Sequence, residues 1–327
     1  MSYCQTYYPG LDLLKFILAI FIIAAHTQLF EEIPTLHQFI SPFEGSAVPT
    51  FFAISAYLFY NRISNCTSKV ESYTILKKNI IRLVTIFGIW YILMLPMTYF
   101  KFFSVATLKE TIYAILLTCT FNGYWFFKAL IINTIILYLC RNQKIFIITS
   151  TIFLLIYLFW SYNYIFNYIS IPISPYYSFY YHTFYFFIGA IIARYQSFIP
   201  NPKTSITLIL YIGTIFLSLN PLLWPICRLI IPFILIVLFK KLAKNINKQT
   251  LLQMRSLSIL LYVTQFMIIW LYNNLCNYYL NHTSDIYQFL QYSVIRFMAV
   301  LSITLSISLL ILKFEKKPSL TFLHKLH

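Results

Sequence analysis

Ten long apolar runs dominate the sequence, and they constrain the fold more than any other feature. They span residues 11–30, 47–63, 80–100, 124–140, 144–161, 176–195, 203–219, 224–240, 257–275 and 287–312. A helix needs about 20 apolar residues to cross a bilayer. Sixty per cent of the 327 residues are hydrophobic and only ten per cent are charged, a balance that excludes a soluble domain of this size. The sequence therefore predicts an all-α polytopic membrane protein, a bundle of about ten transmembrane helices.

The basic residues between these runs predict the orientation of the bundle. With ten spans and a cytoplasmic N-terminus, eighteen Lys and Arg residues fall on the cytoplasmic side, and only Lys101 and Lys109 fall in outer loops. The eighteen are Arg62, Lys69, Lys77, Lys78, Arg82, Arg141, Lys144, Arg194, Lys203, Lys240, Lys241, Lys244, Lys248, Arg255, Lys313, Lys316, Lys317 and Lys325. Counting the apolar segment 104–121 as a span would move thirteen of them outside. We therefore expect this segment on the outer face, and both termini in the cytoplasm.

Charge, cysteines and composition exclude several other classes of protein. The net charge of +16 is loop charge in this interpretation and does not indicate nucleic-acid binding. The six cysteines form no CxxC or metal-binding spacing, so we interpret them as packing residues and predict no metal site. No cleavable leader is expected before the first run, and no stretch could fold as a separate soluble domain. Residues 1–327 are therefore expected to form one transmembrane domain.

The first apolar run contains Lys15 and His26 with ten apolar residues between them. Eleven helical steps bring His26 to within roughly 20° of Lys15, about 16 Å further along the axis. Asp12 shares this face and could pair with Lys15, one turn away. An ionisable side chain within a span costs about 2.5–3.5 kcal/mol, so each one requires a reason. Histidine can accept a proton near neutral pH, which makes His26 a candidate general base; a hydrogen-bonded packing histidine is the alternative.

Six segments occur in a characteristic order along the chain. They are Lys15 with His26, "AVPTFFAISAYLF", "LKKNIIRL", "GYWFFKALI", "FYFFIGAIIAR" and "SLSILLYVTQ". Together they resemble the acyltransferase type 3 family of integral membrane acyltransferases, which act on bacterial surface glycans and related acceptors. The resemblance extends from about residue 5 to residue 312. It implies an acyl-coenzyme A donor, usually acetyl-CoA, an acceptor hydroxyl on a sugar, and catalytic roles for Lys15 and His26.

Three positions depart from the family's pattern. Ser55 is followed by Ala56 where the family usually has Gly, and Asn79 stands where a second Arg often precedes Arg82. Near the ninth run, Tyr262 is followed by Gln265 in place of the family's His. We therefore carry no role over to positions 79 and 265. No hydrolase-like domain is appended in the sequence, so the chemistry is expected within the bundle.

Two further sets of residues are candidates for donor binding and for nucleophilic catalysis. Lys77, Lys78 and Arg82 are expected to face the cytoplasm, where they could bind the phosphates of coenzyme A; an ordinary topogenic cluster is an equally good interpretation. Ser55 could act as an acyl-accepting nucleophile activated by His26. The sequence leaves direct transfer and a covalent intermediate both open.

Several cations are expected in the outer halves of the helices, with no carboxylate beside them inside the membrane. They are His26, Lys128, His182, Arg228 and Arg296. We predict that Lys128, Arg228 and Arg296 bind the acceptor, together with Trp125. An outward-opening cavity with these residues would suit an anionic group, such as the diphosphate of a lipid-linked glycan or an acidic sugar. The alternatives are unrelated interface cations and an interfacial aromatic at Trp125.

The residues and the resemblance together predict a multi-pass O-acyltransferase of the bacterial cytoplasmic (inner) membrane. It would transfer an acetyl group from acetyl-CoA, as co-substrate, to a sugar hydroxyl of a cell-surface polysaccharide or a lipid-linked glycan precursor. The expected partners are the lipid bilayer, the acyl-CoA donor and the saccharide acceptor, with no bound cofactor and no nucleic acid. An exporter or flippase of a glycan or lipid-linked intermediate is the alternative, and it would act without consuming acyl-CoA.

Overall fold

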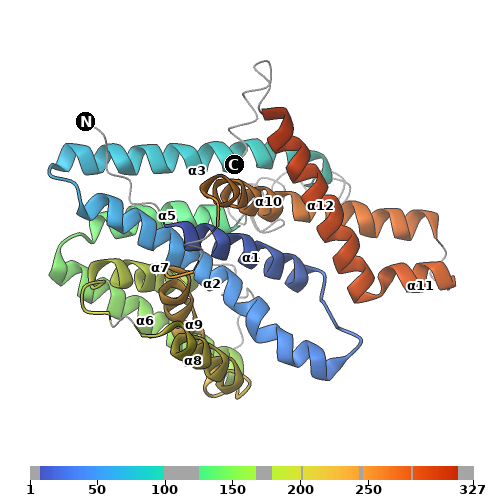
Figure 1. Ribbon diagram of the computed structural model, residues 1–327, viewed down its shortest axis with the longest axis horizontal. Coiled ribbons are helices and arrows are strands. Elements are labelled where there is room, and N and C mark those ends of the chain that lie inside the picture. Colours follow the sequence, from blue (N-terminus) through green and yellow to red (C-terminus); the bar gives the residue numbers. More distant parts are fainter. Residues whose placement is uncertain are drawn as a thin grey trace, which may run out of the picture. The chain divides into compact units, whose positions relative to one another are not determined.

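The computed structural model describes residues 8–98, 125–166, 179–199, 202–242, 246–280 and 283–315, and all regular secondary structure in these ranges is helical (Figure 1). The helices are α1 (Pro9–His26), α2 (Pro34–Ser64), α3 (Lys69–Thr98), α5 (Trp125–Leu139), α6 (Gln143–Phe166), α7 (Phe179–Arg194), α8 (Thr204–Leu217), α9 (Trp224–Phe239), α10 (Lys248–Tyr279), α11 (Asp285–Gln291) and α12 (Ser293–Glu315). The prediction of an all-helical chain is confirmed for these ranges. The expected surface segment 104–121 lies outside the described residues.

Several of these helices have the length and composition of membrane spans. Four of them, α1, α6, α10 and α12, are long and apolar enough to cross a bilayer. Three more, α5, α8 and α9, are apolar but only 14 to 16 residues long. These helices support a multi-pass membrane protein. The total of ten spans and the cytoplasmic position of the termini stay predictions.

Several apolar runs give helices whose bounds differ from those expected, and the runs 47–63 and 287–312 are two examples. α2 begins at Pro34, well before the apolar run 47–63, because its first turns also pack: Phe39 and Phe43 lie 5.9 Å apart between ring centroids, and Phe43 lies 6.3 Å from Phe21 of α1. The run 287–312 is divided into α11 and α12 by the extended residue Tyr292 (φ −56°, ψ 128°). The apolar pattern of the sequence predicts neither the packing of segments of mixed polarity nor a helix break at a single extended residue.

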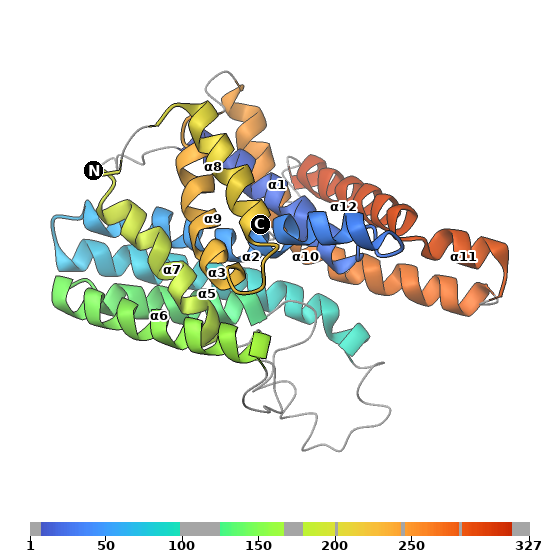
Figure 2. The ribbon, with the colours of Figure 1, turned by 90° about the horizontal axis from the view of Figure 1, so that it is seen from below.

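The chain divides into two compact units. The first contains residues 1–8 and 49–242, and the second contains residues 9–48 and 243–327. In the first unit, α7 contacts α5, α6 and α9, while α8 lies beside α9 and α3 beside α5 (Figure 2). In the second unit, α10 packs against α1 and α12, and α12 also contacts α1 and α11. The expectation of a single transmembrane domain stays a prediction.

One glycine in the first unit allows two helices to approach closely. Gly189 of α7 faces the backbone of Ala53 in α2, and a Cβ atom at position 189 would lie 1.8 Å from the Ala53 carbonyl oxygen. No side chain larger than hydrogen fits there without a shift of one helix. Small residues at such positions allow helices in membranes to pack backbone to backbone. The glycine of "FYFFIGAIIAR" therefore has a packing role.

Candidate active site

Charged residues meet near the start of α1. Asp12 is only 1% exposed, and its carboxylate accepts hydrogen bonds from Arg255 Nε at 2.9 Å and from Arg255 Nη2 at 2.7 Å. Lys15 Nζ lies 3.7 Å from Asp12 Oδ1. The predicted pairing of Asp12 with Lys15 is confirmed. Arg255 was missed as its partner because the charge distribution placed it among the topogenic residues, although it directly precedes the segment "SLSILLYVTQ".

The buried Asp12 carboxylate has two cations beside it. Two cations face one carboxylate, and Arg255 contacts it in the two-point geometry that is the strongest form of such a pair. A buried carboxylate needs such partners, since an uncompensated charge in a low-dielectric interior is costly. The Lys15 side chain lies beside this pair and is 16% exposed.

His26 lies at the other end of α1. It is the last residue of the helix, it is exposed, and its ring meets Phe266 of α10 edge to face, with 4.8 Å between centroids. The helical rise puts it about 16 Å along the axis from Lys15. Its position suits proton transfer to or from a bound molecule.

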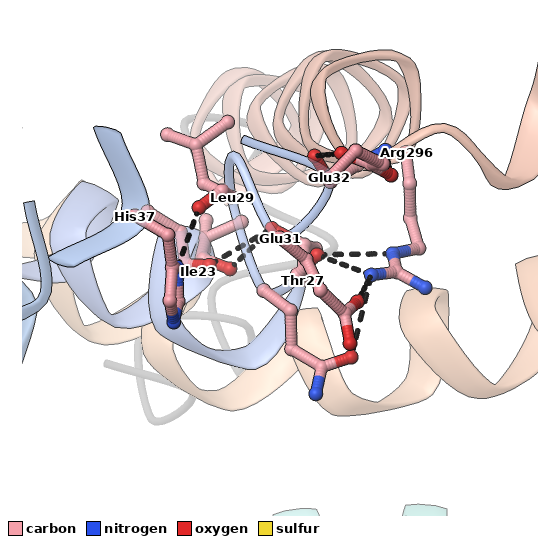
Figure 3. Close-up of polar contacts among 10 residues, drawn as sticks. Ile23, Thr27, Leu29, Glu31, Glu32, His37 and Arg296 are labelled. Atoms are coloured by element: carbon pink, nitrogen blue, oxygen red, sulfur yellow. Dashed lines mark hydrogen bonds and ion pairs between the residues drawn. The ribbon is translucent and has the colours of Figure 1, made fainter. Parts of the chain in front are cut away.

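The chain reverses directly after His26 in a well-defined helix-ending turn (Figure 3). Leu29 donates its N–H to the Ala24 carbonyl at 3.1 Å, and Gln28 donates to the Ala25 carbonyl at 3.3 Å. This is the Schellman pattern, in which the residue after the last turn adopts a left-handed conformation. Glycine usually occupies that position, but here it is Gln28, with φ of 52°. Thr27 adds a side-chain hydrogen bond to the Ile23 carbonyl at 2.8 Å.

Residues from the start of α12 hold this turn (Figure 3). Arg296 donates from Nε and Nη2 to the carbonyl oxygen of Thr27, at 3.0 and 2.7 Å, and Nη2 lies 3.5 Å from Glu31 Oε2. Ser293 donates its backbone N–H to Glu32 Oε1 at 2.6 Å, and its hydroxyl donates to Glu32 Oε2. The Glu32 carboxylate thus caps the N-terminus of α12, where the helix dipole favours negative charge. These contacts bind the end of α1 to the beginning of α12.

The Glu32 carboxyl has a pKa below its ordinary value. Removal from water acts to raise the pKa, but the hydrogen bonds from Ser293 and the charge of Arg296 outweigh this effect and lower it. Glu32 is therefore ionised at neutral pH. The carboxylate that accepts the hydrogen bonds from Ser293 at the start of α12 is therefore negatively charged.

The sequence analysis did not find this set of contacts. It expected no carboxylate beside the outer cations inside the membrane, and it did not foresee that Arg296 lies 3.5 Å from Glu31, directly after the apolar run 11–30. The missed signal was "TQLFEEI", a short segment after His26 that contains two of the chain's eight acidic residues. Two acidic residues directly after a predicted span suggest a nearby basic or helix-capping partner.

Two other residues of α10 complete the description of this unit. Gln265 is fully buried, and its Nε2 donates to the Tyr262 carbonyl at 3.0 Å. It precedes Phe266, the residue in contact with His26. Because this bond lies within one helix, it gives no evidence for a catalytic role of Gln265.

The first unit brings two of the predicted residues together. His182 of α7 is fully buried, stacks on Phe52 with 5.3 Å between ring centroids, and lies 4.7 Å from the ring of Trp125. Arg228 of α9 is 6% exposed and lies over Trp224, 4.5 Å from the ring centroid. Lys128 is half-buried on α5. Trp125 and His182 thus form an aromatic cluster, whereas Arg228 is paired with a different tryptophan.

The residues predicted for donor binding are accessible on α3. Lys77, Lys78 and Arg82 are exposed, and Lys78 and Arg82 lie one helical turn apart. The predicted nucleophile, Ser55, is half-buried and donates its hydroxyl to the Phe51 carbonyl at 2.8 Å. Ser55 belongs to the first unit and His26 to the second.

A cavity of about 230 Å³ lies at the end of α2, lined by Tyr60, Ile63, Ser64 and Arg141. Arg141 donates to the buried Ser72 hydroxyl at 2.6 Å, and its guanidinium lies 5.5 Å from the Tyr138 ring centroid. These two contacts fix a cation in the wall of the cavity. The sequence analysis treated Arg141 only as a topogenic residue.

Apolar helices long enough to cross a bilayer, with a buried ion pair and an exposed histidine on one of them, define an integral membrane protein with a polar site among its helices. A family model described as an acyltransferase domain (Acyl_transf_3) matches residues 8–313. The chain therefore belongs to the acyltransferase type 3 family and is a membrane acyltransferase, which confirms the resemblance seen in the sequence. No curated protein and no solved structure matches it.

Proposed function

We propose that this protein is an O-acetyltransferase of the bacterial inner membrane that transfers the acetyl group of acetyl-CoA to a sugar hydroxyl. The acceptor is a cell-surface polysaccharide or a lipid-linked glycan precursor. The proposal rests mainly on one observation: in a chain of this family, α1 carries Lys15 near one end and an exposed His26 at the other. No structural observation favours the alternative of an exporter.

In the proposed reaction, one ring nitrogen of His26 accepts the proton of the sugar hydroxyl as that oxygen attacks the thioester carbonyl. A carbon–oxygen bond forms, the carbon–sulfur bond breaks, and the proton passes from His26 to the departing thiolate of coenzyme A. The products are the acetylated sugar and the free thiol. A positioned proton acceptor of this kind contributes about 10²–10⁴-fold to the rate.

The charge at the start of α1 suits the donor in this scheme. Lys15, which lies beside the pair of Asp12 and Arg255, would contribute its positive charge there. With about 16 Å between Lys15 and His26, the two residues mark the ends of a path for the pantetheine arm along α1. The phosphates would then be bound by cationic side chains at the cytoplasmic surface, for which we propose Lys77, Lys78 and Arg82. The cavity beside Arg141 offers a further fixed cation in the same unit as these three residues.

The acceptor would contact Trp125, Lys128 and Arg228; the fourth predicted residue, Arg296, is already bound to the Thr27 carbonyl and lies beside Glu31. An aromatic ring such as that of Trp125 can stack on the apolar face of a sugar, and the cations suit an anionic glycan. Direct transfer by His26 needs only the contacts described above. A covalent route through Ser55 is our second proposal. It needs an additional step, since the Ser55 hydroxyl would first have to break its hydrogen bond to the Phe51 carbonyl.

Mass analysis of surface glycans from cells with and without the protein tests this function. We expect the glycan from cells that lack it to lose the mass of one acetyl group per modified sugar. Purified protein in lipid nanodiscs should release free coenzyme A from acetyl-CoA only when an acceptor glycan is present. Unchanged glycan masses, together with no thiol release, would refute the proposed reaction.

A further inference from the structure

The turn after His26 adopts a conformation that its own residues disfavour. Gln28 and Phe30 have φ values of 52° and 63°, and they are the non-glycine residues with positive φ in the described ranges. A left-handed conformation costs roughly 1–2 kcal/mol per residue for a side chain larger than hydrogen. Two such residues within three positions persist only where surrounding contacts hold them.

The contacts that hold the turn come from outside it. Arg296 donates twice to the Thr27 carbonyl, Ser293 donates twice to the Glu32 carboxylate, and the His37 ring nitrogen Nδ1 lies 3.0 Å from the Leu29 carbonyl (Figure 3). Each contact fixes a different point of the segment 27–33. Together they oppose the local preference of Gln28 and Phe30 for right-handed or extended conformations.

The position of His26 depends directly on this turn. His26 is the last residue of α1, and Thr27 follows it in the sequence, so the Thr27 carbonyl belongs to the residue directly after His26. The end of a helix frays readily unless its last carbonyl groups are bound. A guanidinium at this position donates hydrogen bonds to such a carbonyl, and its positive charge interacts favourably with the negative end of the helix dipole.

We propose that Arg296 is a positioning residue for His26 in the acyl transfer, and that Glu32 with Ser293 supports the same turn. This inference rests on the proposed function. Arg296 touches neither the reacting atoms nor the His26 ring; it binds the Thr27 carbonyl and so fixes the last turn of α1. The Arg296 side chain is only 15% exposed and already has two bonds to this oxygen. These contacts suit positioning better than capture of an anionic acceptor.

The test compares four variants with the wild type in nanodiscs: Arg296→Gln, Arg296→Lys, Gln28→Gly, and the double variant Arg296→Gln/Gln28→Gly. Two readouts are used, the kinetics of acetyl transfer and the rate at which diethylpyrocarbonate modifies His26, followed by mass spectrometry. Lys313→Gln is the matched control, because it removes one positive charge from the exposed far end of the same helix.

We expect Arg296→Gln to lower kcat by about ten- to a hundredfold, the loss that a small misplacement of a catalytic group produces, with the KM for the acceptor unchanged. The rate of His26 modification should change in the same variant and not in Lys313→Gln. Arg296→Lys should recover only part of kcat, since lysine cannot make the two-point contact of the guanidinium.

The Gly substitution separates positioning from acceptor binding. Glycine at position 28 adopts the left-handed conformation without strain, so the turn no longer needs Arg296 as strongly. The double variant should therefore recover most of the kcat lost in Arg296→Gln, which an acceptor-binding role cannot explain. A raised acceptor KM with unchanged kcat, no recovery by Gln28→Gly, or an unchanged rate of His26 modification would each overturn the inference.

Failure of the proposed function gives a different result. A wild-type protein that transfers no acetyl group would refute that function, while the modification rate of His26 would still report on the turn. If that rate responds to Arg296→Gln and recovers with Gln28→Gly, Arg296 positions His26 whatever the acyl donor is.

Discussion

Arg255 donates two hydrogen bonds to the carboxylate of Asp12, from Nε at 2.9 Å and from Nη2 at 2.7 Å, and thereby joins α10 to α1. The carboxylate is buried, whereas the Arg255 side chain is 37% exposed. Lys15 adds a longer contact of 3.7 Å to the same group. The Arg255 contact thus contributes to the association of α10 with α1.

Arg255→Gln should destabilise the protein. The variant leaves the buried Asp12 carboxylate with Lys15 as its remaining charged partner, and loss of a partner for a buried acceptor costs about 1–3 kcal/mol. We expect a lower midpoint of thermal unfolding in detergent. The double variant Asp12→Asn/Arg255→Gln should unfold at a higher temperature than Arg255→Gln, because it removes the buried charge as well. Equal midpoints for the double and single variants would contradict this account.

His26→Ala should abolish acyl transfer while leaving the fold intact. A lost general base predicts a fall of about 10²–10⁴-fold in kcat. His26→Gln should be as inactive, since an amide cannot accept a proton near neutral pH. The unfolding midpoint should stay near that of the wild type, because the ring is exposed and its described ring contact is with Phe266. Wild-type activity in His26→Ala would direct attention to His182 of the aromatic cluster.

Gly189→Ala should reduce the amount of folded protein in the membrane. Its Cβ would lie 1.8 Å from the Ala53 carbonyl oxygen, a distance that forces α7 and α2 apart. Overpacking of this kind typically costs about 1–3 kcal/mol. Gly213→Ala is the matched control, because a Cβ there meets nothing within 4 Å. Fluorescence-detected size-exclusion chromatography would compare the two, and equal folded yields would disprove the close approach.

Cysteine accessibility tests the expected orientation. In a protein without its native cysteines, a single cysteine at Ser68 or Asn247 should be protected from a membrane-impermeant maleimide in intact cells. A cysteine at Thr283 should react. All three positions are exposed, so burial within the protein does not explain a difference between them. The opposite labelling pattern would reverse the orientation of the bundle.

The contact between Glu32 and Ser293 should make stability depend on pH. Because the pKa of Glu32 in the folded protein lies below its ordinary value of 4.5, the ionised carboxylate stabilises the fold above that pH. This contribution is lost as the pH falls through the folded-state pKa. The difference in thermal midpoint between wild type and Glu32→Gln should therefore be at its full size at neutral pH and shrink as the pH falls from 4.5 to about 3. A difference that stays constant over this range would count against the ionised cap.

The sequence predicted the parts of the molecule that depend on composition and helical periodicity. The approximate positions of the apolar helices, the shared face of Asp12 and Lys15, and the family all followed from it. The break between α11 and α12 did not, because it depends on Tyr292 and on the Glu32 carboxylate, which is distant in sequence.

Contacts between distant segments account for what the sequence could not predict about the candidate site. Arg255 and Arg296 were recognised as cations, but nothing local shows that one binds Asp12 and the other binds a backbone carbonyl. Gln28 shows the same limit. Its left-handed conformation runs against the preference of glutamine, and only the contacts of the turn with α12 and with His37 explain it.

The distance in sequence between Asp12 and Arg255 has a consequence for how the protein is made. The two residues are separated by 243 positions, and those positions include the described helices of the first unit. During synthesis α1 enters the membrane long before α10 leaves the ribosome, with Lys15 as the nearest countercharge for its carboxylate. Arg296, which binds the Thr27 carbonyl, is synthesised later still. The helix with the proposed catalytic histidine is thus inserted before the helices that supply its partners, so a nascent chain carries His26 without a working site until α10 and α12 have been made.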